Sequence, residues 1–180
     1  GVVIVGNVVI EEKSSVWFNS VIRADVNYVN IGKKCNIQDG TVIHVSSYGF
    51  SAKGEKGNPT IISDNVTIGH NATIHACEIG QNSLIGMGAV ILDQAKIEDF
   101  CLIAAGALVT PGTIVKSREL WAGSPAKFIR KISDKEEGDK ESPKQGGSEK
   151  PEIGTMCEPQ DSKPSIKEGL ISDLDSEGMR

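Results

Sequence analysis

The most regular feature of the chain is an isoleucine or valine that recurs every six positions. A period of six fits neither the 3.6-residue period of an α-helix nor the alternation of a β-strand. It predicts an all-β solenoid of hexapeptide repeats, in which each hexad forms one side of a coil and three hexads complete one turn. The runs are Ile4, Ile10, Val16 and Ile22; Ile31, Ile37 and Ile43; Ile62, Ile68 and Ile74; and Ile79, Ile85, Ile91, Ile97, Ile103, Val109 and Val115.

The position four residues after each aliphatic is usually small, as at Ala72, Ala89 and Cys101. A side chain there shares a narrow interior with the aliphatic column, and this excludes bulk. Composition agrees, because 38% hydrophobic and 4% aromatic residues with 20 glycines leave few large side chains for a conventional globular core. A solenoid needs only a thin aliphatic column that neighbouring coils bury for one another.

The repeat predicts the domain organisation. Residues 1–123 are expected to form the β-helix, and a polar, glycine-rich excursion at 46–60 is expected to form a protruding loop. Ser124 followed by Pro125 is typical of an N-cap and a first helical position. We therefore predict a C-terminal helix over 124–135 that packs along the solenoid.

The net charge of −5 comes from the C-terminal part of the chain. Residues 1–132 carry 12 Lys/Arg and 11 Asp/Glu, whereas 133–180 carry 7 and 13. Few aliphatic and no aromatic residues follow 135, so we expect 136–180 to be a disordered acidic tail. A solvated extension without a partner is favoured over a docking segment, whose partner the composition would not identify. The balanced body shows no basic excess for nucleic acid, and the chain has no apolar run of about 18 residues for a membrane span.

The cysteines and the first residue bear on the compartment. Cys35, Cys77, Cys101 and Cys157 include no CxxC pair, and we interpret them as reduced, mostly buried thiols. We expect a cytoplasmic protein. The mitochondrial matrix is the alternative, because the chain begins at Gly1 and a preceding targeting peptide would not be seen.

The chain has three histidines, His44, His70 and His75, and the repeat predicts where each one lies. When the excursion is counted as one side, His44 and His75 stack on the same face in adjacent coils, about 4.8 Å apart. His70 belongs to the preceding side and should point away from the other two. If the three bind one metal ion, His70 must come from a neighbouring subunit, which closes a cyclic trimer with equivalent sites.

The same count places three further polar residues. Arg23 stacks beneath His44, and Gln38 and Asp39 lie one coil beneath the hexad of His70. Arg23 of one subunit is therefore expected to face Asp39 of the next. Such a pair would orient the interface more than it would stabilise it.

Three segments carry a specific resemblance that covers about residues 1–132. IRADVN, NIQDGTVIH and IGHNATIH, at these separations, resemble the motifs of the γ-class carbonic anhydrases. The resemblance implies a left-handed parallel β-helix that forms a homotrimer, with zinc, or iron in some members, bound at the subunit interfaces. It makes His44 and His75 ligands from one subunit and His70 the ligand from the next.

The resemblance also implies a reaction, the reversible hydration of CO2 to bicarbonate by a metal-bound hydroxide. Arg23, Asp25, Gln38 and Asp39 match the polar positions that organise the interface and the metal-bound water. Gln38 would hold the hydroxide or the product by hydrogen bonding.

The chain departs from the family pattern near Asp25. Members with well-established activity have an acidic residue directly after the Arg-x-Asp motif and glutamates in the following loop, whereas here Val26 and Asn27 follow and the loop contains only Glu55. Proton export is therefore expected to be slow or to use another group. Ala24 replaces the usual glycine, a small change if the backbone there avoids positive φ.

Two other function classes share this pattern. Hexapeptide acyltransferases have the same solenoid and also contain the GSPAK segment found at 123–127, but they use one histidine as a general base and need no metal. The sequence also resembles the shorter-loop bacterial and mitochondrial branch of the γ-class family, in which some members are structural subunits of respiratory complex I. The alternatives are therefore an acyltransferase with an acetyl-CoA-type donor and a catalytically weak structural subunit.

Overall fold

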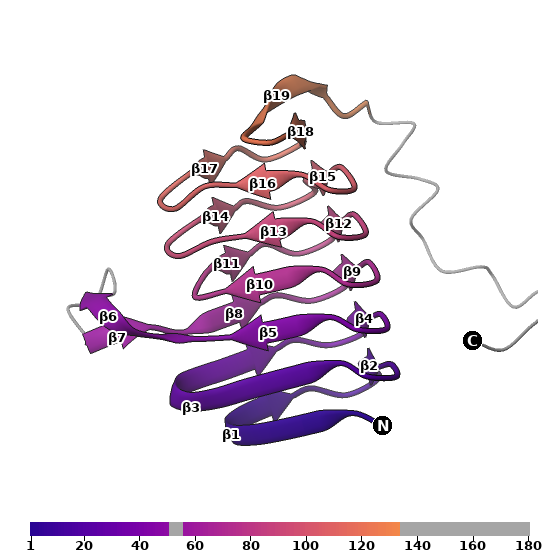
Figure 1. Ribbon diagram of the computed structural model, residues 1–180. Helices are drawn as coiled ribbons and strands as arrows, with labels where there is room; N and C mark the ends of the chain where they lie inside the picture. Colours follow the sequence, from indigo (N-terminus) through magenta and orange to yellow (C-terminus); the bar gives the residue numbers. More distant parts are fainter. Residues whose placement is uncertain (51–55, 134–180) are drawn as a thin grey trace, which may run out of the picture. The chain divides into compact units, whose positions relative to one another are not determined.

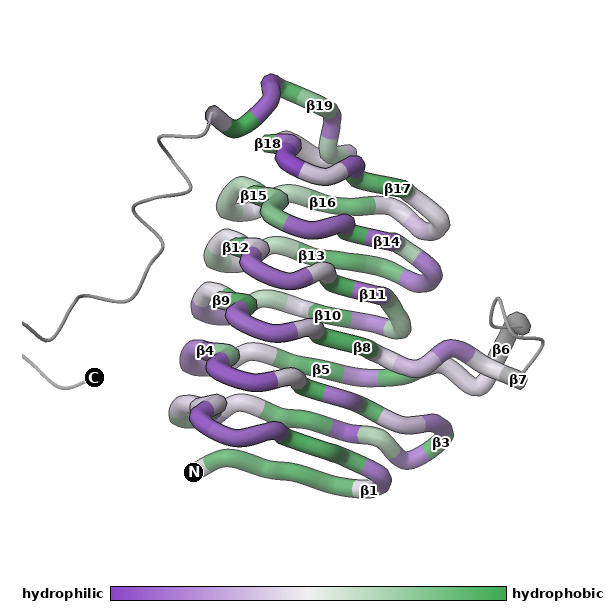
Figure 2. Tube along the Cα trace, turned by 180° about the vertical axis from the view of Figure 1, so that it is seen from behind, coloured by the Kyte–Doolittle hydropathy of each residue, from purple (hydrophilic) through white to green (hydrophobic). Residues whose placement is uncertain are grey.

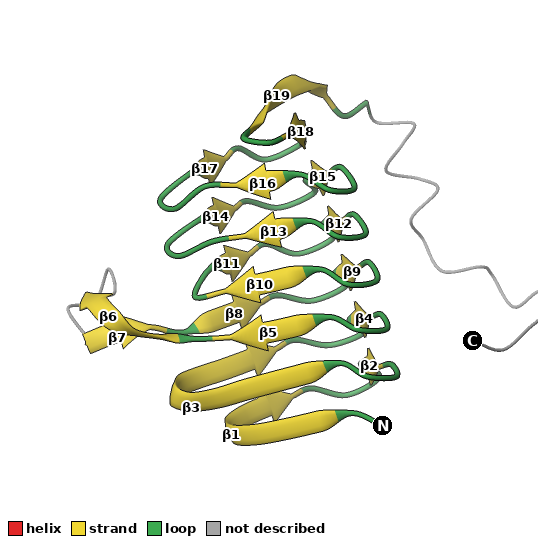
Figure 3. Cartoon of the chain, viewed as in Figure 1, coloured by secondary structure: helices red, strands yellow, loops and turns green. Residues whose placement is uncertain are grey.

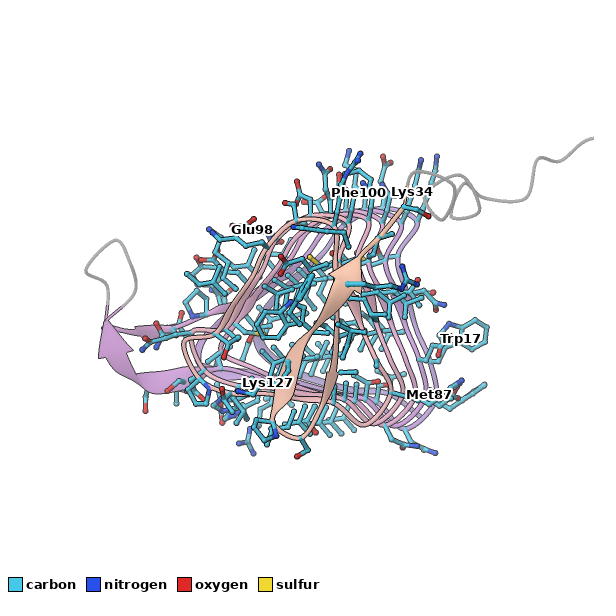
Figure 4. All side chains as sticks on the ribbon, turned by 90° about the horizontal axis from the view of Figure 1, so that it is seen from above. Trp17, Lys34, Met87, Glu98, Phe100 and Lys127 are labelled. Atoms are coloured by element: carbon cyan, nitrogen blue, oxygen red, sulfur yellow. The ribbon has the colours of Figure 1, made fainter. Side chains whose placement is uncertain are left out.

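The computed structural model describes residues 1–50 and 56–133, which form a left-handed parallel β-helix with a triangular cross-section (Figures 1 and 4). Its strands form three flat faces, joined at three corners. Figure 3 shows strands and loops throughout the described residues. The same residues contain no helix long and apolar enough to cross a membrane.

Each face is a parallel sheet to which every coil adds one strand. The long strands β1 and β3 continue from the first face onto the second, and the chain closes with an antiparallel strand on the third. The first face contains β5 (Val42–His44), β10 (Thr73–His75), β13 (Val90–Ile91) and β16 (Leu108–Val109), after β1 (Val3–Ile10) and β3 (Val21–Ile31). The second face continues with β8 (Thr60–Ile62), β11 (Glu78–Ile79), β14 (Lys96–Ile97) and β17 (Ile114–Val115). The third face contains β2 (Ser15–Val16), β4 (Asn36–Ile37), β9 (Thr67–Ile68), β12 (Leu84–Ile85), β15 (Leu102–Ile103), β18 (Glu119–Gly123) and β19 (Ala126–Lys131).

The aliphatic residues of the hexads are Cα partners from coil to coil, as the spacing predicts. On the first face Ile22, Ile43, Ile74, Ile91 and Val109 stack in register. Each of these side chains is fully buried. The small residues of the repeat, such as Ala72 and Ala89, are buried beside them, so a single narrow column is the core of the solenoid.

The corners keep the same backbone geometry from coil to coil. Asn19, Asn65, Asn71 and Asn82 have φ between 56° and 59°, in the left-handed region that asparagine and glycine tolerate best. Hydrophilic segments recur at the turns between β8 and β9, β11 and β12, and β14 and β15 (Figure 2). The third position after the aliphatic residue therefore turns the chain, and a polar residue or glycine occupies it in most hexads, while the aliphatic residue holds the register.

The helix predicted over 124–135 is wrong for the described residues, because Ala126–Lys131 form β19. β19 pairs antiparallel with β18, the last parallel strand of the third face, and so satisfies backbone groups that would otherwise be left at the sheet edge. Gly123, at φ 98°, permits the reversal. Phe128 and Ile129, on β19, are 48% and 54% exposed.

The excursion after His44 is a β-hairpin at its base. β6 (Ser46–Phe50) pairs antiparallel with β7 (Lys56–Asn58), and residues 51–55 lie outside the described part of the chain. The tail predicted over 136–180 also lies outside it. Cys35, Cys77 and Cys101 are buried free thiols, which confirms that interpretation for three of the four cysteines.

Glu119 ties the closing strands to the last coil. Its carboxylate accepts hydrogen bonds from Trp121 Nε1 at 2.8 Å, from the backbone N–H of Lys116 at 3.1 Å and from Lys131 Nζ at 3.0 Å. Burial works to raise the pKa of Glu119, but these donors outweigh it and leave the pKa below its usual value. The carboxylate therefore contributes stability above the pKa of an unfolded glutamate, and this stability is lost as pH falls through the folded pKa.

We predict that Glu119→Gln lowers the free energy of unfolding by about 1–3 kcal/mol at neutral pH, because charged hydrogen bonds are removed. The difference from wild type should disappear in acid, where the wild-type carboxyl is also neutral. Denaturant unfolding at fixed protein concentration across a pH series measures it. The control is Glu78→Gln, which breaks an exposed pair with Lys96 and should change stability by less than about 1 kcal/mol. A pH-independent loss in Glu119→Gln would contradict the account.

Candidate metal centre

Two of the three histidines meet where β5 and β10 end. His44 and His75 are Cα partners in adjacent coils, and Arg23 is the partner of His44 in the coil beneath, as the hexad count predicts. His44 Nδ1 lies 3.2 Å from His75 Nε2, and the ring centroids are 5.1 Å apart. The two side chains are 21% and 29% exposed, so the pair is held by the fold but open to solvent on one side.

Each ring of this pair contacts a carboxylate with its other nitrogen. His44 Nε2 lies 3.0 Å from Asp25 Oδ1, and His75 Nδ1 lies 2.9 Å from Asp93 Oδ2. An ionised carboxylate only accepts hydrogen bonds, so the contact with Asp93 favours a proton on His75 Nδ1 and leaves the lone pair on the Nε2 that faces His44. His44 Nε2 faces both the Asp25 carboxylate and an Arg23 N–H, so Asp25 alone does not set the tautomer of the His44 ring.

Arg23 and Asp25 form the lower part of this corner. Arg23 Nε lies 3.2 Å from Asp25 Oδ2, and an Arg23 guanidinium nitrogen lies 3.0 Å from His44 Nε2. The hydrogen bond from His44 lowers the pKa of Asp25, with help from the nearby guanidinium. Ala24 lies between them in extended β3, only 3% exposed, which agrees with the expected small effect of replacing glycine there.

The third histidine lies at a different corner, at the other end of the first face. His70 is in the turn between β9 and β10, and its Nδ1 lies 3.0 Å from Asp39 Oδ2. Gln38 precedes Asp39 one coil below, in the register predicted from the hexads. Both the His70 and Asp39 side chains are exposed, at 44% and 43%. Among the described residues, no three His, Cys, Asp or Glu side chains of one chain are grouped to hold a metal ion.

The histidine pair fits a transition metal by spacing and by donor type. Two nitrogens bound to one tetrahedral zinc at about 2.0–2.1 Å each are about 3.3 Å apart. The separation of 3.2 Å between the facing nitrogens of His44 and His75 matches this value. Neutral imidazoles whose other nitrogen donates to a carboxylate are also the usual ligands of zinc and iron.

Thr60 locks the two coils of the pair together after the hairpin excursion. Its buried hydroxyl donates to the His44 carbonyl at 2.5 Å and accepts the Ala76 N–H at 2.9 Å. The Ala76 N–H also contacts the His44 carbonyl, at 3.1 Å. The backbones that follow His44 and His75 are therefore joined through one side chain.

Sequence reasoning missed two parts of this centre. Asp93 lies in the coil above His75. Continuing the hexad count by one coil takes His75 to Leu92, the residue directly before Asp93. Thr60 follows the excursion, where the repeat gives no register. The count could therefore have found Asp93 but not Thr60.

The fold and this geometry define a hexapeptide-repeat β-helix protein, and comparison with known proteins narrows the class. The chain is 44% identical over 133 residues to gamma carbonic anhydrase 2, mitochondrial, of Arabidopsis thaliana, covering 74% of this chain and 47% of that protein. It is 38% identical over 133 residues to a carbonic anhydrase of Geobacillus kaustophilus, covering 74% of this chain and 68% of that protein. Residues 2–138 match the family model described as dynactin subunit 5.

A solved structure agrees with the sequence matches. A hexapeptide transferase family protein from Anaplasma phagocytophilum superposes with a TM-score of 0.68 at 42% identity, over 76% of this chain and 75% of that one. The chain therefore belongs to the γ-carbonic-anhydrase-like family of hexapeptide-repeat proteins. It spans about half the length of the Arabidopsis relatives it matches.

We predict that Thr60→Val lowers the free energy of unfolding by about 1–3 kcal/mol, because the His44 carbonyl loses a buried donor and the Ala76 N–H loses its shorter acceptor. Thr67→Val, at a partly exposed position of the third face, is the matched control and should stay within about 0.5 kcal/mol of wild type. Denaturant unfolding at fixed protein concentration compares them. Equal stabilities of the two variants would contradict the role of Thr60.

Proposed function

We propose that the protein is a metal-dependent carbonic anhydrase that reversibly hydrates CO2 at sites shared between the subunits of a homotrimer. Zinc is the proposed metal, and iron is the alternative. The observation that carries the proposal is the His44 and His75 pair, whose facing nitrogens are 3.2 Å apart. His70, at the other end of the same face, is the proposed third ligand from the next subunit.

The corner that contains His70 has the character of a contact surface. Two large apolar side chains occupy the same hexad position as His70: Phe18, below Asp39, and Met87, directly above His70. They are 64% and 57% exposed. Figure 4 shows Met87 pointing outward from the solenoid. Burial against a second copy would remove this apolar surface from water while it brings His70 to the partner's pair.

The first face, which joins the two corners, is also suited to burial. Its outward positions form a column without any charge, made of Val21, Val42, Thr73, Val90 and Leu108. The second face instead exposes Glu78 and Lys96, which form an ion pair at 3.4 Å. Because uncharged surface is cheaper to desolvate, the first face supports the proposed interface.

Each polar residue of the centre has a proposed task. Arg23 and Asp25 hold the outer edge of His44, and Asp39 orients His70 through its Nδ1. Arg23 and Asp39 of adjacent subunits are proposed to face each other across the interface. Gln38 is proposed to hold the substrate oxygen or the bicarbonate product by hydrogen bonds. The metal, when bound, supplies Lewis acidity that lowers the pKa of water to near neutrality.

Proton release distinguishes this chain from the family pattern. Val26 occupies the position after Asp25 and is 51% exposed, so this place offers no carboxylate to accept a proton. The nearby Asp25 carboxylate is already engaged by His44 and Arg23, and its lowered pKa makes it a poor proton acceptor. We infer that protons leave to other groups or directly to buffer.

Two alternatives have specific support. The Anaplasma structure is described as a hexapeptide transferase family protein, which favours an acyltransferase with an acetyl-CoA-type donor. The family model is named for a subunit of a larger assembly, which favours a structural role. The acyltransferase alternative does not explain a metal site formed by three histidines. A structural subunit could have this metal site without catalysing any reaction. The Arabidopsis relatives are named mitochondrial, which favours that compartment over the cytoplasm for this chain.

Subunit mixing tests the shared site. We predict that His70→Ala and His75→Ala trimers each fail to bind Co²⁺, because every interface lacks one ligand. Each refolded trimer that contains both variants should regain one intact interface, where His70 of a His75→Ala subunit meets His44 and His75 of a His70→Ala subunit. Co²⁺ content by equilibrium dialysis and stopped-flow CO2 hydration measure the recovery.

The matched control mixes His44→Ala with His75→Ala, because both substitutions damage the same half of the site. A subunit of either variant supplies His70, but neither supplies a complete pair, so these trimers should stay metal-free. Recovery in the control, or none in the first mixture despite trimer assembly, would overturn the shared site. Metal recovery without CO2 hydration would leave the site standing and favour the structural role.

A further inference from the structure

We propose that Asp93 is a positioning residue that fixes the tautomer and ring orientation of His75 so that Nε2 is free to bind the metal. This inference rests on the proposed metal site and adds to it a residue on another coil. Its basis is the 2.9 Å contact between Asp93 Oδ2 and His75 Nδ1. Asp93 would not touch substrate or metal, and it would act only through the imidazole.

The chemistry of the contact determines the tautomer. The Asp93 carboxylate accepts hydrogen bonds and the imidazole has one proton when neutral, so that proton lies on Nδ1. Nε2 then carries the lone pair that a metal requires. The ring is turned so that this same nitrogen faces His44 Nδ1 at 3.2 Å. A proton on Nε2 instead would block the ligand position.

Asp93 is well placed to hold the ring because its backbone is fixed on both sides. The next residue, Gln94, donates its N–H at 2.7 Å to the carbonyl of Ala76, the residue that follows His75. The carbonyl of Asp93 accepts the N–H of Gly112 from the coil above at 2.9 Å. The carboxylate and the imidazole therefore sit at one corner, on adjacent coils whose backbones are tied directly to each other.

The carboxylates of the other two histidines are engaged differently. Asp25 divides its oxygens between His44 and Arg23, so its position also depends on the guanidinium. Asp39 holds His70 at an exposed corner that is proposed to meet another subunit. Asp93 is 36% exposed and contacts a ring that is 29% exposed, and both residues belong to the same subunit. His75 is therefore proposed to be the preorganised ligand of the site.

The test compares wild type with Asp93→Ala and Asp93→Asn. The control is Asp99→Ala, which removes a carboxylate that accepts from Gln81 at another corner without contacting a histidine. With three histidines in the chain, ¹⁵N-labelled imidazoles can be assigned, and long-range ¹H–¹⁵N spectra of the metal-free protein report the tautomer of His75. Co²⁺ dissociation constants of the trimers are measured by chelator competition.

We expect the Nδ1–H tautomer in wild type and in Asp99→Ala, and its loss in Asp93→Ala. Co²⁺ affinity should fall by about 10–100-fold in Asp93→Ala. The Co²⁺ affinity of Asp93→Asn should lie between those of wild type and Asp93→Ala, because its amide oxygen still accepts a hydrogen bond from Nδ1 but carries no charge. Thermal unfolding of each variant checks that the coils remain folded.

An unchanged His75 tautomer in Asp93→Ala, or a Co²⁺ affinity equal to that of wild type, would overturn the role of Asp93. A comparable loss of Co²⁺ affinity in Asp99→Ala would overturn it too, since the effect would then be general. If the wild-type trimer itself binds no Co²⁺, the proposed metal site fails. The tautomer spectra still show in that case whether Asp93 orients the ring.

Discussion

The structure depends on one constraint, the stacking of one aliphatic side chain per hexad in a narrow column that runs through the coils. Ile22, Ile43, Ile74 and Ile91 are each completely buried and in register. Removing such a side chain to alanine costs about 2–5 kcal/mol, whereas a slip of register by one residue would turn every aliphatic on that side outward. The column thereby fixes the height and direction of every residue next to it. His44 and His75 converge because each directly follows a column residue.

This constraint explains why so much of the centre follows from spacing. The hexad count alone stacks Arg23, His44 and His75, and it places Asp39 one coil beneath His70. It cannot determine how the rings rotate, because χ angles depend on neighbours from other coils. The contact of His75 with Asp93 is one example, because the count gives the position of Asp93 but not the rotation of the His75 ring. The Thr60 bridge escapes the count for another reason, since it follows an irregular excursion. The zinc or iron and the second subunit remain predictions of chemistry and resemblance.

The closing strand, β19, shows where prediction from local sequence fails. Ser124 and Pro125 predict the start of a helix, yet residues 126–131 form a strand. Local preference for a helix start is worth about 1 kcal/mol, and it competes here with a row of open backbone groups on β18. Glu119, Trp121 and Lys131 then join the two strands through side chains. Local signals cannot reveal a sheet edge that only exists once the coils below have formed.

The proposed metal site is a property of the assembly, because one chain brings only two of its histidines together. Native mass spectrometry of untagged protein, purified without chelator, measures oligomer mass and bound metal in one experiment. We predict a trimer that binds one transition-metal ion per interface. A trimer that stays metal-free after zinc, and after iron supplied without oxygen, would contradict it and favour an acyltransferase or a structural subunit.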